Sequence, residues 1–384
     1  MIFNFTIKMR IYIITLHRTH NYGSVLQSFA LQNVLINTFG QDVIILDYSP
    51  YRYTNRGLLN KLKYKSSKFK NPLLLLAARI LIYPSYIRKN LIFGKYLKKK
   101  LKLSDIRFST SDEAKGKFDD ADVFCTGSDQ VWNSHWNDGI DKTLFLEFAP
   151  KGKLCFSYAA SFGLSQLPEK EVKTTKELLE KYEFISVRED SGIKILESLG
   201  RNDGVHVLDP TLLMAKEEWQ RESSDKFLGR KYVLTYNLHH DPEIDKYAQT
   251  LAEEEGLKVY NISYNWHDIV RKGHLKWCPT VENFLSLIEN ATYVVADSFH
   301  AVAFSIIFER QFISISPEVA SSRITSILNL LGLEDRIVNK FTDTSKIKEY
   351  IDYTKVKGLL NIEKYKSMNY LKMVLETKTF THNK

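Results

Sequence analysis

The sequence has few cysteines and no long uninterrupted apolar run. Its three cysteines, Cys125, Cys155 and Cys278, form no CxxC pair, which excludes a disulfide scaffold and argues against a zinc ribbon. Free thiols are typical of proteins in a reducing compartment. The longest apolar run, Pro72–Pro84, is broken by Arg79 and falls short of the ~20 residues that a membrane-spanning helix needs. We therefore expect a protein that crosses no membrane.

Acidic residues are missing from one segment, residues 51–103, which we call the basic segment. It holds 15 Lys and Arg residues and no Asp or Glu, which leaves 39 basic and 45 acidic residues elsewhere. The formal net charge of +9 comes from this segment alone. A charge run is most often a solvated surface. Because apolar residues are interleaved with the basic ones, the segment also favours peripheral contact with an anionic membrane. No recognition module for nucleic acid is present.

The remaining composition is that of a globular protein. Hydrophobic residues make up 44% and charged residues 26% of the 384 residues, so the chain can bury a core and is not disordered. The length predicts two or three domains. No small-residue cleavage site precedes His17–His20, so we expect no secretory signal and a cytoplasmic protein.

Short apolar runs alternate with amphipathic helical patterns, which predicts an α/β fold with parallel sheets. Strands are expected at Ile11–Leu16, Val43–Leu46, Asp122–Thr126, Cys155–Ala159, Phe184–Val187, Val205–Leu208, Tyr232–Tyr236, Leu257–Ile262, Tyr293–Ala296 and Gln311–Ile315. The polar stretch Glu217–Arg230 is interpreted as a linker in which no residue forms a core face. The predicted division is an N-terminal Rossmann-like domain (1–216), the linker (217–230), a C-terminal Rossmann-like domain (231–345) and a helical tail (346–384), with a ligand cleft between the two domains.

Several common site motifs are absent. Without GxGxxG, GxxxxGK[ST] or GxSxG, a dinucleotide fingerprint, a Walker loop and a serine hydrolase are not supported. His239 and His240 lack partners for a metal site. Asn21, Gly23 and Ser24, between a strand and a helix, could bind an anion at the helix N-terminus, although an ordinary N-cap is the favoured explanation of these residues taken alone.

Polar residues follow the strand that ends at Thr126. Ser128, Asp129 and Gln130 can hydrogen-bond sugar hydroxyls, and Trp132 can stack on a sugar face. The carboxyl ends of parallel strands form the ligand crevice of open α/β sheets. The alternative is a capped turn with a core tryptophan.

A histidine, His300, follows the strand that ends at Ala296 and opens a helix. It could donate to an anion or act as a general acid, oriented by Asp297 or Ser298. A packed histidine is the alternative.

Two arginines stand at comparable places. Arg188 ends a strand and could clamp a phosphate or carboxylate, although its spacing favours a salt bridge with Glu189 or Asp190. Arg323 opens a helix after the last strand and raises the same question.

Six motifs together identify a resemblance that covers about 300 residues. They are NYGSVLQSFALQ (Asn21–Gln32), TGSDQVWN (Thr126–Asn133), SYAASFG (Ser157–Gly163), ISVREDSG (Ile185–Gly192), VLDPTLLM (Val207–Met214) and VVADSFHAVAFSIIF (Val294–Phe308). In this order they resemble the polysaccharide pyruvyl transferase family.

The resemblance implies a GT-B-like fold, with two Rossmann-like domains facing across a cleft. It implies transfer of the enolpyruvyl unit of phosphoenolpyruvate to a sugar, which forms a pyruvate ketal without a metal or redox cofactor. The family's essential histidine maps to His300 and its earlier arginine to Arg188. Many relatives carry arginine where this chain has Ser298, so Arg323 becomes the candidate cation for the donor's phosphate.

We therefore expect a phosphoenolpyruvate-dependent pyruvyl transferase of exopolysaccharide or capsule synthesis, whose acceptor is a lipid-linked or nucleotide-linked sugar. His300 and Arg188 are the expected catalytic residues. Asp297, Ser298 and Arg323 are expected to bind the donor, and the acceptor is assigned to the loops that contain Asn21, Gly23, Ser24, Ser128, Asp129, Gln130 and Trp132. Two alternatives stay open, a GT-B glycosyltransferase that uses a sugar nucleotide and a non-catalytic glycan-binding relative.

Overall fold

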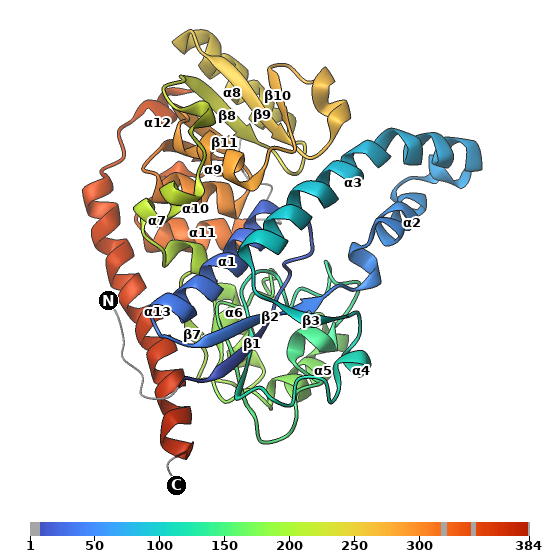
Figure 1. Cartoon of the computed structure of the whole chain (residues 1–384). Coiled ribbons are helices and arrows are strands. Elements are labelled where there is room, and N and C mark those ends of the chain that lie inside the picture. The colour runs from blue at the N-terminus through green and yellow to red at the C-terminus, as the bar shows by residue number, and fades with distance from the viewer. Residues whose placement is uncertain (1–7, 316–320, 339–342, 383–384) are drawn as a thin grey trace.

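The computed structural model describes residues 8–315, 321–338 and 343–382 and shows two packed lobes (Figure 1). The elements of the N-terminal lobe are β1 (Arg10–Ile14), α1 (Tyr22–Asn37), β2 (Asp42–Tyr48), α2 (Asn55–Lys65), α3 (Pro72–Lys100), β3 (Leu103–Phe108), α4 (Ser111–Ala114), β4 (Val123–Thr126), β5 (Leu154–Ser157), α5 (Glu169–Leu179), β6 (Ser186–Val187), α6 (Asp190–Ser198), β7 (Val205–His206) and α7 (Lys216–Glu222). Those that follow are β8 (Tyr232–Tyr236), α8 (Pro242–Glu255), β9 (Lys258–Ser263), β10 (His274–Trp277), α9 (Val281–Glu289), β11 (Tyr293–Ala296), α10 (Phe299–Ile307), β12 (Gln311–Ser314), α11 (Ser321–Leu330), α12 (Ser345–Lys348) and α13 (Tyr353–His382).

Each lobe is built on a five-stranded sheet, and the second sheet repeats the topology of the first. The strand orders are β3-β2-β1-β4-β5 and β10-β9-β8-β11-β12, and the paired strands run parallel. Alternate residues of β1 enter different cores, since Ile11 and Ile13 join one hydrophobic cluster and Tyr12 and Ile14 another. The predicted parallel α/β fold is confirmed.

Two strands were not predicted, β3 and β10, and each lies at the edge of its sheet. β3 carries only one fully buried residue, Phe108, and β10 carries none. An edge strand needs no continuous apolar run, because one side of it has no neighbouring strand. The sequence pattern of these strands is correspondingly weak.

The two lobes share one continuous hydrophobic core in which Tyr22 is central. Its ring, at the start of α1, stacks between two rings of the C-terminal lobe, with centroid distances of 4.2 Å to Phe284 and 5.4 Å to Tyr264. The Tyr22 hydroxyl donates to the carbonyl of Pro279 at 2.5 Å. Core residues of both sheets belong to the same cluster, so burial of apolar surface holds the lobes together.

The stretch Glu217–Arg230 is not an empty linker, and the expectation that none of it forms a core face is wrong. Trp219 of α7 is fully buried, and its ring lies 5.9 Å from Phe29 of α1 and 5.0 Å from Phe304 of α10. Phe227 is buried too. The single tryptophan among charged residues contributes its large apolar area to the junction of the lobes.

The C-terminal tail is helical, as expected, and α13 packs back on the N-terminal lobe (Figure 1). The Tyr370 hydroxyl donates to the carbonyl of Ser157 at 2.8 Å, and the Ser367 hydroxyl accepts the N–H of Leu208 at 2.9 Å. The first strand, β1, and the helix α13 thus lie on the same lobe.

The basic segment forms a helical hairpin of α2 and α3 that projects from the body (Figure 1). Its base is tied to the C-terminal lobe, because Arg88 donates to the carbonyls of Trp277 and Cys278 at 3.0 and 3.2 Å. Among the described residues, no helix is both long and apolar enough to cross a membrane.

We predict that Trp219→Ala lowers the free energy of unfolding by about 3–5 kcal/mol, because truncating a fully buried tryptophan leaves a cavity between the lobes. Denaturant titration followed by circular dichroism measures the change. Arg221→Ala, on an exposed position of the same helix, is the control and should change it by less than about 0.5 kcal/mol. Equal midpoints for both variants would contradict the role of Trp219.

Candidate functional site

The site lies where the strand order of each sheet reverses. In both sheets the reversal falls between the first and fourth strands along the lobe, β1 and β4 or β8 and β11, and ligands of open α/β sheets bind at the carboxyl ends of these strands. The segments that follow these strands carry Asp129 and His239 in loops, and Ser24 and His300 in the first turns of α1 and α10. The packing of the lobes brings them together with residues that follow β6 and β7.

Arg188, which follows β6, is a buried guanidinium surrounded by carboxylates. It donates to Asp209 at 2.9 Å and to Asp129 at 3.1 Å, and its Nε lies 3.8 Å from Glu189. Its side chain is 0% exposed. Burial alone would lower the pKa of Arg188, but Asp129 and Asp209 outweigh it and raise the pKa. The salt bridge favoured by the sequence spacing thus exists, but its shorter contacts reach carboxylates of other loops.

Asp209 connects Arg188 to His300. Its carboxylate accepts the hydroxyl of Ser128 at 2.9 Å and the N–H of Thr211 at 3.0 Å. The Nε2 of His300 lies 3.7 Å from its Oδ2, which is ion-pair distance and longer than a hydrogen bond. Burial alone would raise the pKa of Asp209, but His300 and Arg188 outweigh it and lower the pKa. Asp209 is therefore an anion that faces an imidazole from the other lobe.

His300 is packed directly against the backbone of the N-terminal lobe. A Cβ atom on Gly23 would lie 1.9 Å from the Nδ1 of His300, so only glycine allows the imidazole to approach this closely. The neighbouring Ser24 hydroxyl donates to Asp129, whose φ of +77° is left-handed. The strained residue and the close approach occur at the same place, as is typical of functional sites.

Arg323, in the first turn of α11, is the third cation of the group. Burial first, and then the nearby Arg188, lower the pKa of Arg323 to about 10. One turn further along, the Ser326 hydroxyl contacts the Asp190 carboxylate at 3.2 Å, so α11 packs beside the start of α6. The charges of Arg188, Asp129 and Asp209 act on Arg323, so its guanidinium lies within electrostatic reach of the Arg188 group.

Asp297 holds the loop after β8 instead of orienting His300. Its carboxylate accepts the N–H groups of Leu238 and His239 at 2.8 and 2.9 Å, and it lies 2.8 Å from the Nδ1 of His239. The hydrogen bond with Asp297 raises the pKa of His239. Ser298 is the N-cap of α10, and no side chain caps that helix. The carboxylate next to His300 is Asp209, so the expectation that Asp297 orients His300 is corrected.

Three predicted acceptor residues have structural partners instead. Trp132 is 3% exposed and stacks on Phe145 with a centroid distance of 5.2 Å, so its ring presents no face to a sugar. Gln130 accepts a hydrogen bond from Asn133 at 2.6 Å. Asn21 caps α1 by accepting the N–H of Gly23 at 2.8 Å. The alternative interpretations of Trp132 and Asn21, a core tryptophan and an N-cap, match what is observed.

Sequence reasoning missed Asp209 and His239 as members of the site. Each lies three residues after the end of a strand, Asp209 after β7 and His239 after β8. The same rule that selected Asp129, a polar residue at the carboxyl end of a predicted strand, would have selected them.

Comparison with known proteins assigns the family. A family model described as polysaccharide pyruvyl transferase matches residues 21–318. The chain belongs to this family. The matched range includes Gly23, Asp209 and His300, which the structure places in contact or close to one another. Membership makes the protein a transferase of polysaccharide synthesis. A search of curated protein sequences finds no match.

Solved structures share the fold at low sequence identity. AviGT4, a glycosyltransferase of avilamycin A biosynthesis, has a TM-score of 0.53 at 9% identity, with 97% of this chain and 98% of that chain covered. The UDP-N-acetylglucosamine 2-epimerase from Rickettsia bellii has a TM-score of 0.51 at 10% identity, with 97% of each chain covered. The S. aureus MnaA–UDP structure has a TM-score of 0.50 at 11% identity, with 96% and 97% covered. The predicted GT-B fold is thus confirmed.

We predict that Asp209→Asn destabilises the protein in a pH-dependent way. Removing one partner of a buried ion pair costs about 3–5 kcal/mol. Because folding lowers the pKa of Asp209 below its ordinary 3.8, this stabilisation is complete above that pH and is lost as the pH falls through the lower folded-state value. Denaturant titrations at pH 7 and near pH 3 measure the free energy of unfolding of both proteins. The difference between wild type and variant should be smaller near pH 3 than at pH 7.

Asp203→Asn is the control, since Asp203 forms an exposed pair with Arg201 and should affect stability little. If the free energies of unfolding of wild type and Asp209→Asn differed by the same amount at both pH values, the result would contradict a charged Asp209.

Proposed function

We propose that this protein transfers the enolpyruvyl unit of phosphoenolpyruvate to two hydroxyls of one acceptor sugar, with release of phosphate. The observation that carries the proposal is the meeting of His300 from one lobe with Gly23 and Asp209 from the other. An imidazole at a lobe junction, next to a buried carboxylate and two guanidiniums, suits the binding of a small multiply charged donor.

Cationic groups of the C-terminal lobe support a donor site beside His300. Among the described residues, no ion pair or hydrogen bond engages the guanidinium of Arg323, so its charge is available to a phosphate or carboxylate. His239 carries a raised pKa and lies within electrostatic reach of Arg323. The uncapped N-terminus of α10 adds free N–H groups. Many relatives carry an arginine at the position of Ser298. In this chain the groups named above supply the positive charge instead.

The reaction requires one proton on carbon and the loss of one phosphate. The imidazole of His300, which faces Asp209, delivers the proton to the methylene carbon of the donor as the first sugar hydroxyl adds to the neighbouring carbon. That hydroxyl's proton returns to a base. The carbon–oxygen bond to phosphate then breaks, and the second hydroxyl closes the ketal and releases its own proton. Protons, carbon and phosphate balance without a redox cofactor or metal.

Arg188 serves this proposal as a positioning residue. Its guanidinium is already bonded to Asp129 and Asp209, so its function is to keep Asp209 charged and in place beside His300. The sequence had assigned Arg188 to the substrate itself.

We predict that His300→Ala reduces phosphate release from phosphoenolpyruvate by at least about a hundredfold, the usual contribution of a positioned general acid. Purified protein is incubated with phosphoenolpyruvate and lipid-linked or nucleotide-linked sugars, and free phosphate is measured. Release of a nucleotide from a sugar nucleotide instead would favour the glycosyltransferase alternative. Acceptor binding without release of either product would indicate a glycan-binding protein.

A glycine variant tests the same geometry without altering the imidazole. Gly23→Ala places a methyl group where the His300 ring lies, so it should reduce phosphate release while circular dichroism shows a folded protein. Gly358→Ala is the matched control, because no atom lies within 4 Å of the added Cβ. Full activity of Gly23→Ala would exclude His300, as placed here, from the mechanism.

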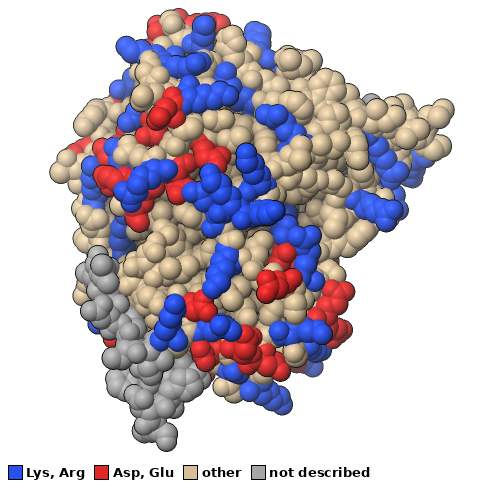
Figure 2. Space-filling model, in the orientation of Figure 1, with Lys and Arg blue, Asp and Glu red and all other residues tan. Residues whose placement is uncertain are grey.

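We further propose that the protein works on the cytoplasmic face of an anionic membrane and that the hairpin of α2 and α3 makes the contact. A row of large apolar side chains at spacings of three and four runs along α3 and is exposed to solvent. It consists of Leu73, Leu76, Ile80, Tyr83, Ile87 and Leu91. Exposed apolar side chains on a basic hairpin suit contact with the interface of an anionic membrane. Figure 2 shows the projecting end of the hairpin with basic and uncharged surface and without acidic groups.

Charge favours a bilayer over a second copy of the chain. The basic segment has 15 basic residues and no acidic one, so two hairpins facing each other would repel. Each Lys or Arg near an anionic lipid surface contributes about 1 kcal/mol of attraction. An anionic bilayer can bury the apolar row and attract the basic residues at the same time.

We predict that the full-length protein sediments with vesicles that contain phosphatidylglycerol and not with phosphatidylcholine vesicles, and that raising salt weakens the binding because exposed charges are screened. Leu76→Glu/Ile80→Glu should abolish sedimentation. Ile362→Glu, an exposed apolar position on α13, is the matched control. Equal binding to neutral vesicles, or self-association of the lipid-free protein through α3, would contradict the proposal.

A further inference from the structure

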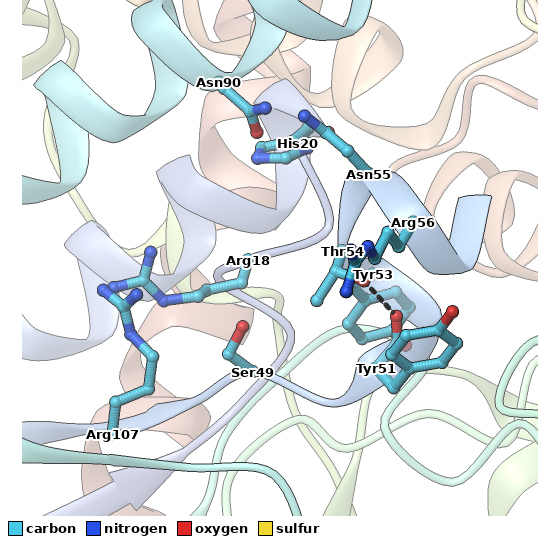
Figure 3. A pocket seen from close by; sticks show the side chains of 10 residues that line it. All are labelled: Arg18, His20, Ser49, Tyr51, Tyr53, Thr54, Asn55, Arg56, Asn90 and Arg107. Carbon is cyan, nitrogen blue, oxygen red and sulfur yellow. Dashed lines mark hydrogen bonds between the residues drawn. The ribbon is translucent and has the colours of Figure 1, made fainter. Parts of the chain in front are cut away.

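A cavity of about 530 Å³ lies at the base of the hairpin (Figure 3). None of its lining residues belongs to the His300 cluster. It opens at the carboxyl ends of β1, β2 and β3, on the same edge of the sheet as the candidate site. Three arginines line it, Arg18, Arg56 and Arg107, and none of the lining side chains is acidic. The lining therefore favours an anionic ligand.

A single carboxylate outside the lining arranges two of these arginines. Asp47 accepts hydrogen bonds from the Nη2 of Arg18 at 2.8 Å and from the Nε of Arg107 at 2.9 Å. Figure 3 shows the two guanidiniums side by side. The single negative charge of Asp47 thus faces two positive charges. Nη1 of Arg18 and both terminal nitrogens of Arg107 form no hydrogen bond with Asp47. These donors are preorganised in the fork geometry that phosphate oxygens prefer.

The opposite wall comes from the start of the hairpin. Within the part of the chain that the structure describes, Arg56 is exposed and has no charged or hydrogen-bonding partner. The buried Oδ1 of its neighbour Asn55 has no hydrogen-bond partner either. His20 is neutral, because burial and then Lys89 and Arg18 lower its pKa to about 4. The cavity thus combines excess positive charge with neutral groups that can bond hydroxyls.

The cavity is close to the proposed reaction centre. His20 lines the cavity, and Gly23, three residues further along, lies against His300. Three residues span at most about 11 Å of chain. The cavity lining at His20 and the residue that contacts the imidazole are thus close neighbours on the same segment.

We propose that this cavity is the acceptor subsite and that it binds the phosphate or diphosphate of a glycosyl phosphate through Arg18, Arg107 and Arg56. The inference rests on the proposed transferase function, since it names the class of its acceptor. A glycosyl diphosphate occurs on lipid carriers and on nucleotides. The shared chemistry is the anionic group next to the sugar whose hydroxyls receive the pyruvyl unit.

Binding of inorganic pyrophosphate to the full-length protein, with phosphoenolpyruvate saturating, tests the subsite by calorimetry. Arg56→Gln/Arg107→Gln should weaken pyrophosphate binding at least tenfold and leave phosphoenolpyruvate binding unchanged. Arg323→Gln should weaken phosphoenolpyruvate binding and leave pyrophosphate binding unchanged. Arg221→Gln, an exposed arginine on α7, should change neither. Arg56→Gln alone, at an exposed position without a partner among the described residues, should weaken pyrophosphate binding several-fold and keeps the test valid if the double variant does not fold.

Acceptors of three kinds then identify the source of the anion, a prenyl diphosphate sugar in detergent, a nucleotide diphosphate sugar and the same sugar without phosphate. A KM at least tenfold higher for the phosphate-free sugar in the wild type, with this difference lost in Arg56→Gln/Arg107→Gln, supports the subsite. Pyrophosphate binding that is equal in wild type and variants overturns it. Because phosphoenolpyruvate binding is measured separately, failure of the subsite and failure of the proposed function give different results.

Discussion

The buried guanidinium of Arg188 is the charge on which the site depends. A guanidinium with no exposed surface requires compensating carboxylates, and Asp129 and Asp209 supply them from two different loops. The same carboxylates interact with His300 across the lobe junction. Because each charge is held by the others, the loops that carry them are fixed relative to one another before any substrate arrives.

The repeated topology explains why groups from two lobes can cooperate. Each sheet reverses its strand order at one point, and the loops at that point are the ones free to carry polar side chains. The continuous core formed around Tyr22 places the two reversal points against each other. The N-terminal lobe contributes Arg188 with its two carboxylates and a glycine contact, and the C-terminal lobe contributes His300, Arg323 and a helix N-terminus.

Most of the fold could be predicted from the sequence, because strands buried on both faces leave continuous apolar runs. The edge strands β3 and β10 could not, since most of their residues are exposed or half-buried and form no such run. In the site, the positions of His300, Arg188 and Arg323 after strands were informative. Asp209 also follows a predicted strand, so the same rule selects it. Its contact with His300 depends on lobe packing, which residue spacing does not encode. Trp132 and Trp219 show the same limit, because a lone tryptophan among polar residues can face a ligand or a core.

The stacking of Tyr22 between Phe284 and Tyr264 couples the opening of the lobes to the geometry of the reaction centre. Tyr22 and Gly23 are consecutive residues. Tyr22 packs against the opposite lobe, and Gly23 contacts His300. Any rotation that opened the lobes enough to withdraw the tyrosine ring would also pull the glycine away from the imidazole. Substrate entry and disassembly of the reaction centre would then be one motion, so the enzyme could react only when closed.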